Sequence, residues 1–508
     1  MAVPSTPFPS DRRRMTTLSD LLSVLPAKAR LHVPRGRDEV RAVTISDVTH
    51  DSGEAGPGVL FACRPGRHLD GHDFAPSAVA AGSPALLVER ILDPDVPQIR
   101  VPSVADALGD VAAEVHGHPS TSLQLAGVTG TNGKTTIVFL LEAVLAAAGH
   151  TTGVVGTVST RIAGQSVPGA RTTPEASDLQ RLLRRMVDAG VTAAAMEVSS
   201  HALALGRVTG TRFAVAVFTN LTQDHLDFHA DIEDYFAAKA RLFTPGFTPS
   251  AVVNVDDPFG RRLAEQTPVQ VVRVGSSPGD HVTAREVNSG PAGSAFTALL
   301  RGRPVAVRTH LTGHFNVTNA LCALAAADVM GIDAGTAAAG IAALPGVPGR
   351  MERVEAGQPF TVLVDYAHTP DSLENVLGAA RAISTSRVLV VVGCGGERDR
   401  GKRPLMGRIA AEGADLAVLT SDNPRGEDPM AILDAMAAGA RTVPGGTYTV
   451  EPSRRAAIAQ ALGEARPGDV VVIAGKGHET HQELADRVVD FDDRVVAREL
   501  LTSGTVAS

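Results

Sequence analysis

The chain has 508 residues, of which 44% are hydrophobic and 20% are charged, and this composition is that of a globular protein rather than a disordered or collagen-like one. At roughly 150 residues per domain, we expect about three domains. The net charge is −8, with no Trp and three Tyr, so we expect no nucleic-acid partner. The three cysteines, Cys63, Cys322 and Cys394, form no CxxC pair, which is typical of a reducing compartment and favours the cytoplasm.

Residues 1–17 are expected to form a disordered tail. They contain prolines, serines and three consecutive arginines, and no apolar stretch of about 7–15 residues follows to complete a secretory signal. The sequence also lacks the ~18 uninterrupted apolar residues that a membrane span needs. We therefore expect a soluble protein without a membrane span.

Short apolar runs separated by turn residues predict a small α/β domain at residues 18–121. The runs expected to be strands are residues 42–48, 59–63 and 85–88. The pattern changes at His118-Pro119-Ser120, and a new strand begins at Leu123. The sequence therefore places a domain boundary near residue 121.

A central domain is expected at residues 122–348. The strand from Leu123 leads into a glycine-rich loop at residues 127–136, and a helix with apolar residues at helical spacing follows and stops at Gly149. Further buried strands are expected at residues 191–195, 213–219 and 251–255. Because these strands alternate with helical stretches, we expect a mostly parallel sheet.

A third α/β domain is expected at residues 349–508. Two prolines and two glycines interrupt the pattern at residues 345–349 and indicate a linker. Beyond it, helices such as residues 371–383 alternate with strands expected at residues 361–364, 388–392, 416–419 and 470–474.

The loop Gly130-Thr131-Asn132-Gly133-Lys134-Thr135-Thr136 lies between a strand and a helix. Backbone N–H groups and the helix N-terminus there would surround a phosphate, with Lys134 on the β- and γ-phosphates and Thr135 on Mg²⁺. The spacing departs from the usual phosphate loop, because Val128 stands where the first glycine is normally found and Gly127 comes one place earlier. A plain glycine-rich turn is the alternative interpretation.

Two further segments follow buried strands. Glu197 ends one strand, and Asp224-His225-Leu226-Asp227 follows the strand that ends at Thr219. Carboxyl ends of parallel strands present ligand-facing side chains, so we expect Glu197 and His225 to bind metal. Each residue alone would be an ordinary satisfied polar group, and the prediction depends on their combination.

Six motifs in this order resemble those of the Mur ligase family, which comprises ATP-dependent amide ligases of peptidoglycan synthesis. The motifs are residues 130–136, residues 197–201, Asn220 with residues 224–227, residues 313–316 with Asn319, residues 349–352, and residues 365–370. The resemblance covers nearly the whole chain. It implies an α/β protein of three domains: a small N-terminal UDP-sugar domain, a central phosphate-loop ATPase with a mostly parallel sheet, and a Rossmann-like C-terminal domain for the amino acid.

Within the family, three segments are similar to the member that adds the third peptide residue: Asp422-Asn423-Pro424-Arg425, residues 393–399 and residues 475–479. This implies an ADP-forming ligase that joins diaminopimelate, rather than lysine, to the D-Glu side chain of UDP-N-acetylmuramoyl-L-Ala-D-Glu through an acyl phosphate. It also implies ATP as co-substrate, two Mg²⁺ ions, a monomer, and a role in cell wall biogenesis, cell shape and division. The meso and LL isomers of diaminopimelate are left open.

The resemblance also implies which residues contact each substrate. ATP is contacted by residues 130–136 together with Asn316, Arg350 and Asp365. The UDP-muramoyl dipeptide is contacted by Ser52, Arg67, His68, Leu69, Thr172, Thr173, Ser199, Arg207 and a carbamylated Lys239. Diaminopimelate is contacted by Arg398, Asp422, Asn423, Pro424, Arg425, Gly475 and Glu479. The metal ligands are Thr135, Glu197, His225 and the carbamylated Lys239, and the catalytic residues are Lys134, Glu197, His225 and Lys239.

The residues alone allow plainer interpretations of some positions. On this interpretation, Lys239 is a solvated helix lysine, Arg350 is a surface charge in a linker, and Arg425 is a surface residue after a turn. Leu205 departs from the family, in which glutamine is common at this position.

Two alternative functions remain open at this point. A folylpolyglutamate synthase-like ligase shares the fold and the acyl-phosphate route, but it usually lacks the UDP-sugar domain and the Asp-Asn-Pro-Arg motif. The other alternative is a non-catalytic scaffold protein related to the ligases. The presence of Lys134, Thr135, Glu197, His225 and Lys239 argues against it.

Overall fold

The computed structural model describes residues 15–34, 43–66, 69–169 and 171–503. The chain forms two compact units: the first comprises residues 1–127, 150–214 and 241–249, and the second comprises residues 128–149, 215–240 and 250–508. Most of the tail expected at residues 1–17 lies outside the described residues. Its last two residues form β1 (Thr16–Thr17), because they pair with β3 (Thr44–Ile45) and Thr17 caps the following helix in a capping box with Asp20.

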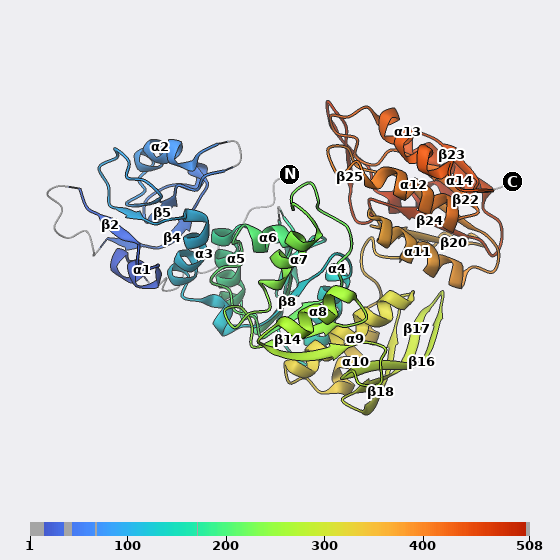
Figure 1. Cartoon of the computed structure of the whole chain (residues 1–508), viewed down its shortest axis with the longest axis horizontal. Coiled ribbons are helices and arrows are strands. Elements are labelled where there is room, and N and C mark those ends of the chain that lie inside the picture. Colours follow the sequence, from blue (N-terminus) through green and yellow to red (C-terminus); the bar gives the residue numbers. More distant parts are fainter. Residues whose placement is uncertain (1–14, 35–42, 67–68, 170, 504–508) are drawn as a thin grey trace. The chain divides into compact units, whose positions relative to one another are not determined.

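The N-terminal part of the first unit is a five-stranded sheet (Figure 1). Its strands, in spatial order, are β2 (Arg30–His32), β7 (Gln98–Arg100), β6 (Leu86–Val88), β5 (Val59–Ala62) and β4 (Asp47–Thr49). Only β2 runs antiparallel to its neighbour. Apolar side chains of α1 (Leu18–Val24) and α3 (Val104–Val115) share one core with the sheet, and α2 (Ala75–Ala80) contributes to a second core.

The rest of the first unit contains further strands and helices, and one of the strands ends at the predicted site residue Glu197. They are β9 (Thr152–Val155), β10 (Thr160–Ile162), β11 (Gln165–Val167), α5 (Ala176–Asp188), β12 (Ala193–Glu197) and α6 (Ser200–Ala204). β12 is parallel to β9, whereas β10 and β11 form an antiparallel hairpin beside β9. On α5 the buried residues Leu179, Leu183 and Met186 recur at helical spacing and form its inner face. β8 (Gln124–Thr129) leads from this unit into the second.

In the second unit, four strands form a parallel run, and two further strands extend it in antiparallel fashion. The run is β13 (Val215–Phe218), β14 (Ser250–Asn254), β15 (Gln270–Val274) and β16 (Val282–Gly290). β16 continues into an antiparallel meander with β17 (Gly293–Leu300) and β18 (Arg303–Thr309). The sequence pattern did not predict this meander, because β16 buries only Val282, and β17 and the end of β18 bury only alternate residues.

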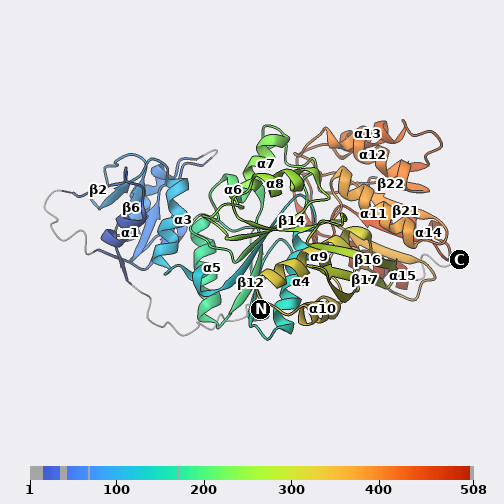
Figure 2. The same ribbon diagram turned by 60° about the horizontal axis from the view of Figure 1, so that its bottom comes forward.

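Helices α4 (Lys134–Ala147), α9 (His314–Val329) and α10 (Ala334–Ala343) lie together in the second unit (Figure 2). The unit also contains α7 (Ile232–Ala240) and α8 (Pro258–Gln266). α9 is buried on nearly all sides, because it packs against α4 and against the strands β13 to β16. Within the described part of the chain, no helix has both the length and the apolar content to cross a membrane.

The C-terminal part of the second unit is a doubly wound sheet. Its strands, in spatial order, are β19 (Glu352–Arg353), β20 (Thr361–Asp365), β24 (Val470–Ala474), β21 (Val388–Val392), β22 (Leu416–Leu419) and β23 (Tyr448–Val450). All pairs are parallel except β19 with β20, so the expected Rossmann-like, mostly parallel arrangement is confirmed.

Helices cover both faces of this sheet. Apolar residues of α11 (Pro370–Ile383), α12 (Lys402–Gly413) and α13 (Pro429–Ala440) form one core, and those of α14 (Arg454–Glu464) and α15 (Asp493–Thr502) form the other. A short hairpin, β25 (His481–Glu483) and β26 (Val488–Asp490), follows β24. The carboxyl ends of β20, β21, β22 and β24 lead into the motif segments at residues 365–370, 393–399, 422–425 and 475–479.

Candidate active site

Two glycines of the phosphate loop are required by its conformation. Gly130 and Gly133 have φ values of +148° and +89°, which favour glycine. A side chain at Gly130 would collide with the hydroxyl of Thr219, and one at Gly133 would place its Cβ 2.6 Å from Oδ1 of Asn319. Glycine is therefore required at both positions, because of the backbone conformation and because residues from other parts of the chain leave no room for a side chain.

Asn220 holds the loop in place by accepting two hydrogen bonds from it. The backbone N–H of Thr131 donates to the Asn220 carbonyl at 2.9 Å, and that of Asn132 donates to the Asn220 side chain, also at 2.9 Å. Asn220 follows β13, so the loop and this strand end are fixed to one another. A loop that is already ordered binds a phosphate with little further loss of entropy.

Two lysines share one carbonyl of this loop. Lys134 Nζ donates to the carbonyls of Gly130 at 2.9 Å and Thr131 at 2.8 Å, and Lys239 Nζ donates to the Gly130 carbonyl at 2.8 Å. Lys239 is only 1% exposed, so its interpretation as a solvated helix lysine is wrong. Burial, with the charge of Lys134, lowers the pKa of Lys239 well below its ordinary value, although Asp224 opposes the shift.

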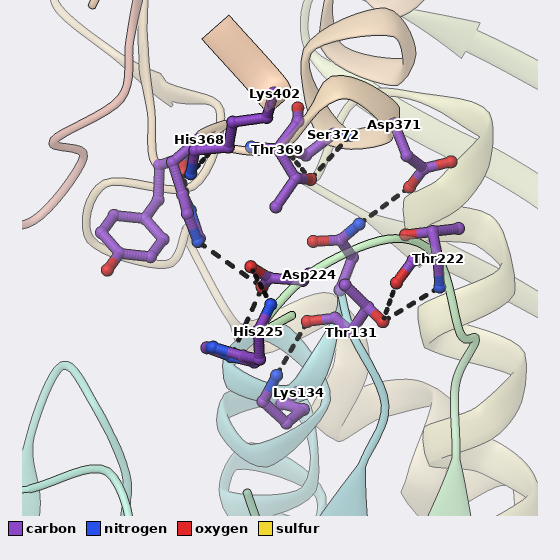
Figure 3. Close-up of polar contacts among 12 residues, drawn as sticks. Thr131, Lys134, Thr222, Asp224, His225, His368, Thr369, Asp371, Ser372 and Lys402 are labelled. Atoms are coloured by element: carbon purple, nitrogen blue, oxygen red, sulfur yellow. Dashed lines mark hydrogen bonds and ion pairs between the residues drawn. The ribbon is translucent and has the colours of Figure 1, made fainter. Parts of the chain in front are cut away.

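Asp224 lies between two histidines (Figure 3). Its Oδ2 atom is 3.4 Å from Nε2 of His225 and 3.9 Å from Nε2 of His368, and the His368 carbonyl accepts a 2.8 Å hydrogen bond from Lys402. Burial alone would raise the pKa of Asp224, but the charges of these groups and of Lys134 outweigh it and hold this pKa at about 2. Asp224 is therefore an ionised carboxylate beside His225. The backbone of His225 has a left-handed φ of +57°, a conformation that persists only where the surrounding structure holds it.

A cavity of 830 Å³ adjoins the loop within the second unit. Six of the ten residues assigned to ATP line it: Asn132, Gly133, Thr136, Asn316, Arg350 and Asp365. Residues along the whole length of α11 also line the cavity, and its Asp371 accepts a 2.8 Å hydrogen bond from Asn132 (Figure 3). The volume is within the range of small-molecule sites, so the structure brings these residues together around a space suited to a nucleotide.

Arg350 lies at the phosphate loop rather than on an exposed linker. Its guanidinium donates to the Thr135 hydroxyl at 3.1 Å and lies 4.4 Å from the centre of the Tyr366 ring. The carboxylate of Asp365 accepts the backbone N–H groups of Met351 at 2.7 Å and of Ala367 at 2.8 Å. Burial raises the pKa of Asp365, and Arg350 opposes the shift.

Four of the residues assigned to the muramoyl dipeptide lie together in the first unit: Thr172, Thr173, Ser199 and Arg207. The Thr173 hydroxyl donates to the Glu197 carbonyl at 2.9 Å and accepts the Ser199 N–H at 3.1 Å. The Glu197 carboxylate accepts the N–H and hydroxyl of Thr157 at 2.8 and 3.1 Å, and the hydroxyls of Thr157 and Thr172 are 2.9 Å apart. The carboxyl end of β12 is therefore surrounded by hydroxyl groups, which can both donate and accept hydrogen bonds.

Arg207 joins this group through Glu175. Arg207 donates to the Thr173 carbonyl at 3.4 Å, and its guanidinium is 2.9 Å from the Glu175 carboxylate. Arg171 also pairs with Glu175, and Arg64 does so at 2.6 Å. Three guanidinium groups around one carboxylate leave an excess of positive charge, which suits an anionic substrate.

The remaining dipeptide residues are less closely connected to this group. Ser52 begins a short 3₁₀ helix (Ser52–Glu54), and Leu69 is 68% exposed. Arg67 and His68 lie outside the described residues. Leu205 is the C-cap of α6, two residues before Arg207.

The residues assigned to diaminopimelate gather at the carboxyl ends of β21, β22 and β24. The buried Lys476 donates to Asn423 Oδ1 at 3.0 Å and to the Glu479 carboxylate at 2.8 Å, and Asn423 donates to the same carboxylate at 2.9 Å. A Cβ at Gly475 would lie 2.7 Å from Asp422 Oδ2. The motif residues 422–425 and 475–479 are thus one hydrogen-bonded group.

Arg425 follows Pro424 with a left-handed φ of +51°. Its Nε is 2.7 Å from the Glu483 carboxylate, and it donates to the Gly396 carbonyl at 2.9 Å. Its side chain is 23% exposed, so Arg425 is anchored rather than a free surface residue. Arg398 lies exposed on the same 393–399 segment that contains Gly396.

The residues assigned to metal do not form a metal cage built from protein groups alone among the described residues. Among the described residues, His, Cys, Asp and Glu do not form a group of three or more arranged to hold a metal ion. Mg²⁺ usually binds through one or two protein oxygen groups plus phosphate oxygens and water. Thr135 and Glu197, each within its own unit, carry oxygen atoms of a chemical type that fits Mg²⁺ bound in this way.

Sequence reasoning assigned no role to four residues that the structure places in these clusters: Glu175, Asp371, Lys402 and Lys476. Three of them follow the quoted motifs closely or lie within them: Glu175 after Thr172-Thr173, Asp371 after residues 365–370, and Lys476 within residues 475–479. That proximity could have indicated them. Lys402 follows residues 393–399 by three positions, and its 2.8 Å hydrogen bond to the His368 carbonyl connects it to this cluster.

Comparison of the sequence with known protein families identifies the family of this chain. Residues 128–327 match the Mur ligase middle domain, residues 349–477 match the Mur ligase glutamate ligase domain, and residues 44–116 match the Mur ligase family catalytic domain. A curated relative in Streptomyces coelicolor is 46% identical over 99% of each chain. The chain belongs to the Mur ligase family.

The name of that relative is UDP-N-acetylmuramoyl-L-alanyl-D-glutamate–2,6-diaminopimelate ligase. A solved structure of a Mur ligase with the same name is 32% identical, with a TM-score of 0.69, and covers 96% of this chain and 99% of its own. The folylpolyglutamate synthase of Mycobacterium tuberculosis also resembles this chain, with a TM-score of 0.60 at 21% identity over 77% of this chain and 93% of its own. At that identity the likeness shows a shared fold alone.

Proposed function

We propose that this protein is an ATP-dependent, ADP-forming ligase that joins 2,6-diaminopimelate to the D-Glu side chain of UDP-N-acetylmuramoyl-L-alanyl-D-glutamate. The 46% identity to the Streptomyces coelicolor ligase, over 99% of both chains, carries this proposal. The hydrogen-bonded group of Asn423, Lys476 and Glu479 supports it, because it offers charged partners for an amino acid. No observation favours the folylpolyglutamate synthase alternative.

The chemistry requires activation, because a carboxylate and an amine do not condense in neutral water. The D-Glu carboxylate oxygen attacks the γ-phosphorus of ATP, the bond to ADP breaks, and an acyl phosphate forms. The amine then attacks the acyl carbon, loses a proton, and expels inorganic phosphate from a tetrahedral intermediate. In this scheme Lys134 stabilises charge on the transferred phosphoryl group, and the other residues position the substrates.

We infer that Mg²⁺, two ions by the family pattern, is held by Thr135, Glu197, His225 and a carbamylated Lys239. Bound Mg²⁺ would neutralise charge on the phosphates. A carbamate forms when the Lys239 amine adds to the carbon of CO₂ and releases a proton, which turns a cationic side chain into an oxygen ligand. The burial of Lys239 among loop atoms supports this modification, because a charged ammonium is costly there.

We also propose a division of labour among the domains expected from sequence. Residues 18–121 bind the UDP-sugar, residues 122–348 bind ATP, and residues 349–508 bind the amino acid. The protein acts as a monomer in the cytoplasm and serves peptidoglycan synthesis, and through it cell shape and division.

One reaction tests this function. The purified protein, incubated with ATP, Mg²⁺, the UDP-muramoyl dipeptide and diaminopimelate, should form the UDP-muramoyl tripeptide, detected by mass spectrometry. Separate meso and LL samples identify the isomer used. Absence of tripeptide with every isomer would support the scaffold alternative instead.

A further inference from the structure

Arg454 forms a completely buried ion pair. Arg454 lies at the start of α14, and Asp493 lies at the start of α15. The Nε of Arg454 donates to one carboxylate oxygen of Asp493 at 2.7 Å, and a terminal guanidinium nitrogen donates to the other, also at 2.7 Å. Both side chains are 0% exposed. Neither residue belongs to the sequence motifs described above.

The remaining hydrogen bonds of Arg454 reach two backbone carbonyls. One is that of Ala474, at 2.9 Å, and the other is that of Ser421, at 3.4 Å. Ala474 ends β24 and immediately precedes Gly475, while Ser421 follows β22 and immediately precedes Asp422. Each carbonyl therefore belongs to the residue just before a segment assigned to the amino acid.

β24 and β22 are not neighbours in the sheet, because β21 lies between them. No ladder hydrogen bond joins them directly, so the relative position of their carboxyl ends depends on β21 and on side chains that span it. Arg454 is such a side chain. It contacts both strand ends from the face covered by α14 and α15.

Stability alone does not explain this pair. Replacing a buried ion pair by well-packed apolar residues is often neutral or stabilising. An arginine in the first turn of a helix also lies at the end whose partial charge is positive, which is unfavourable. What the arginine provides, and an apolar side chain would not, is a planar donor set that can bond one carboxylate and two separate carbonyls at once.

We propose that Arg454, held by Asp493, is a positioning residue that sets the distance between the Asp422–Arg425 and Gly475–Glu479 segments and thereby the affinity for the incoming amino acid. This inference rests on the proposed function. The two segments meet through Asn423, Lys476 and Glu479. A displacement of either strand end would separate these partners.

The test compares Arg454→Lys, which keeps the charge but loses the planar donor set, with the wild type. We expect the KM for diaminopimelate to rise about tenfold or more, while the KM values for ATP and for the UDP-muramoyl dipeptide change by less than about twofold. Asp493→Asn, which leaves Arg454 in place but weakens its anchor, should raise the same KM by a smaller factor. It serves as the second variant if Arg454→Lys does not fold.

Arg387→Lys is the matched control. Arg387 pairs with Asp469 at 2.7 Å, and Asp469 immediately precedes the first residue of β24, at the end opposite the amino-acid segments. The Arg387→Lys substitution should therefore lower the melting temperature without changing the KM for diaminopimelate. An unchanged diaminopimelate KM in a folded Arg454→Lys or Asp493→Asn protein, or an equal rise for all three substrates, would overturn the positioning role. A wild-type protein that does not use diaminopimelate would instead overturn the proposed function.

Discussion

Lys134 and Lys239 come from different helices and donate to the same backbone oxygen, that of Gly130, at 2.9 and 2.8 Å. Two ammonium groups at one acceptor repel each other, and burial disfavours the charge on Lys239 in particular. The two lysines are therefore not equivalent. Lys134, on the phosphate loop, is suited to contact an anion, whereas Lys239 is the one suited to chemical modification.

Lys134→Ala should abolish amide formation while the protein stays folded. Lys134 is partly exposed and donates to the loop carbonyls of Gly130 and Thr131, so its loss removes positive charge from the phosphate site. Phosphate release and a melting curve measure the two effects separately. Near-wild-type turnover at saturating ATP would contradict the phosphate-loop assignment.

Lys239→Ala should be severely impaired and partly rescued by added short carboxylic acids. A small carboxylate can occupy the space of the lost carbamate and restore an oxygen ligand. Turnover measured against acetate or formate concentration checks this, with Lys134→Ala as the control that these acids should not rescue. An unimpaired Lys239→Ala enzyme would remove Lys239 from the catalytic set.

The fold was largely predictable because its parallel strands are buried on both faces and read as continuous apolar runs. The strand expected at residues 388–392, for example, matches β21 (Val388–Val392), in which all five residues are buried. The meander of β16 to β18 was not predicted, since few of its residues are fully buried and its strands carry charged side chains such as Arg285.

The site was predictable in its motifs but not in its backbone. His225, Met351, Glu397 and Arg425 all have positive φ values, between +47° and +57°. Such conformations are unfavourable for residues other than glycine and persist only where surrounding contacts hold them. Those contacts come from distant parts of the chain, as does the burial of Lys239, so no local pattern could reveal them.

Arg425→Ala should raise the KM for diaminopimelate steeply. The guanidinium can bind the distal carboxylate that distinguishes diaminopimelate from lysine, and losing one partner of such a pair costs roughly 2–5 kcal/mol, or about thirtyfold and more in affinity. The KM values for ATP and the UDP-muramoyl dipeptide should stay nearly constant. Arg455→Ala, which removes an exposed ion pair with Glu499, is the control, and equal effects of the two substitutions would refute the specificity role.

His478 predicts a pH dependence of stability. Burial and the nearby charges of Arg350 and Arg494 lower the pKa of His478 to about 3, whereas an unfolded chain has a histidine pKa of about 6.5. Between these values the unfolded state binds a proton that the folded state does not, so the free energy of unfolding falls as the pH drops. His478→Gln should lose less melting temperature than the wild type between pH 7 and pH 5, and equal losses would contradict this assignment.

The central claim is that the chain ligates diaminopimelate, and ATP-dependent phosphate release tests it most directly. With the UDP-muramoyl dipeptide present, the amino acid is varied among lysine, meso-diaminopimelate and LL-diaminopimelate. We predict rapid release of phosphate with one diaminopimelate isomer and little or none with lysine or without the dipeptide. Equal or faster release with lysine, or release that does not need the dipeptide, would contradict it.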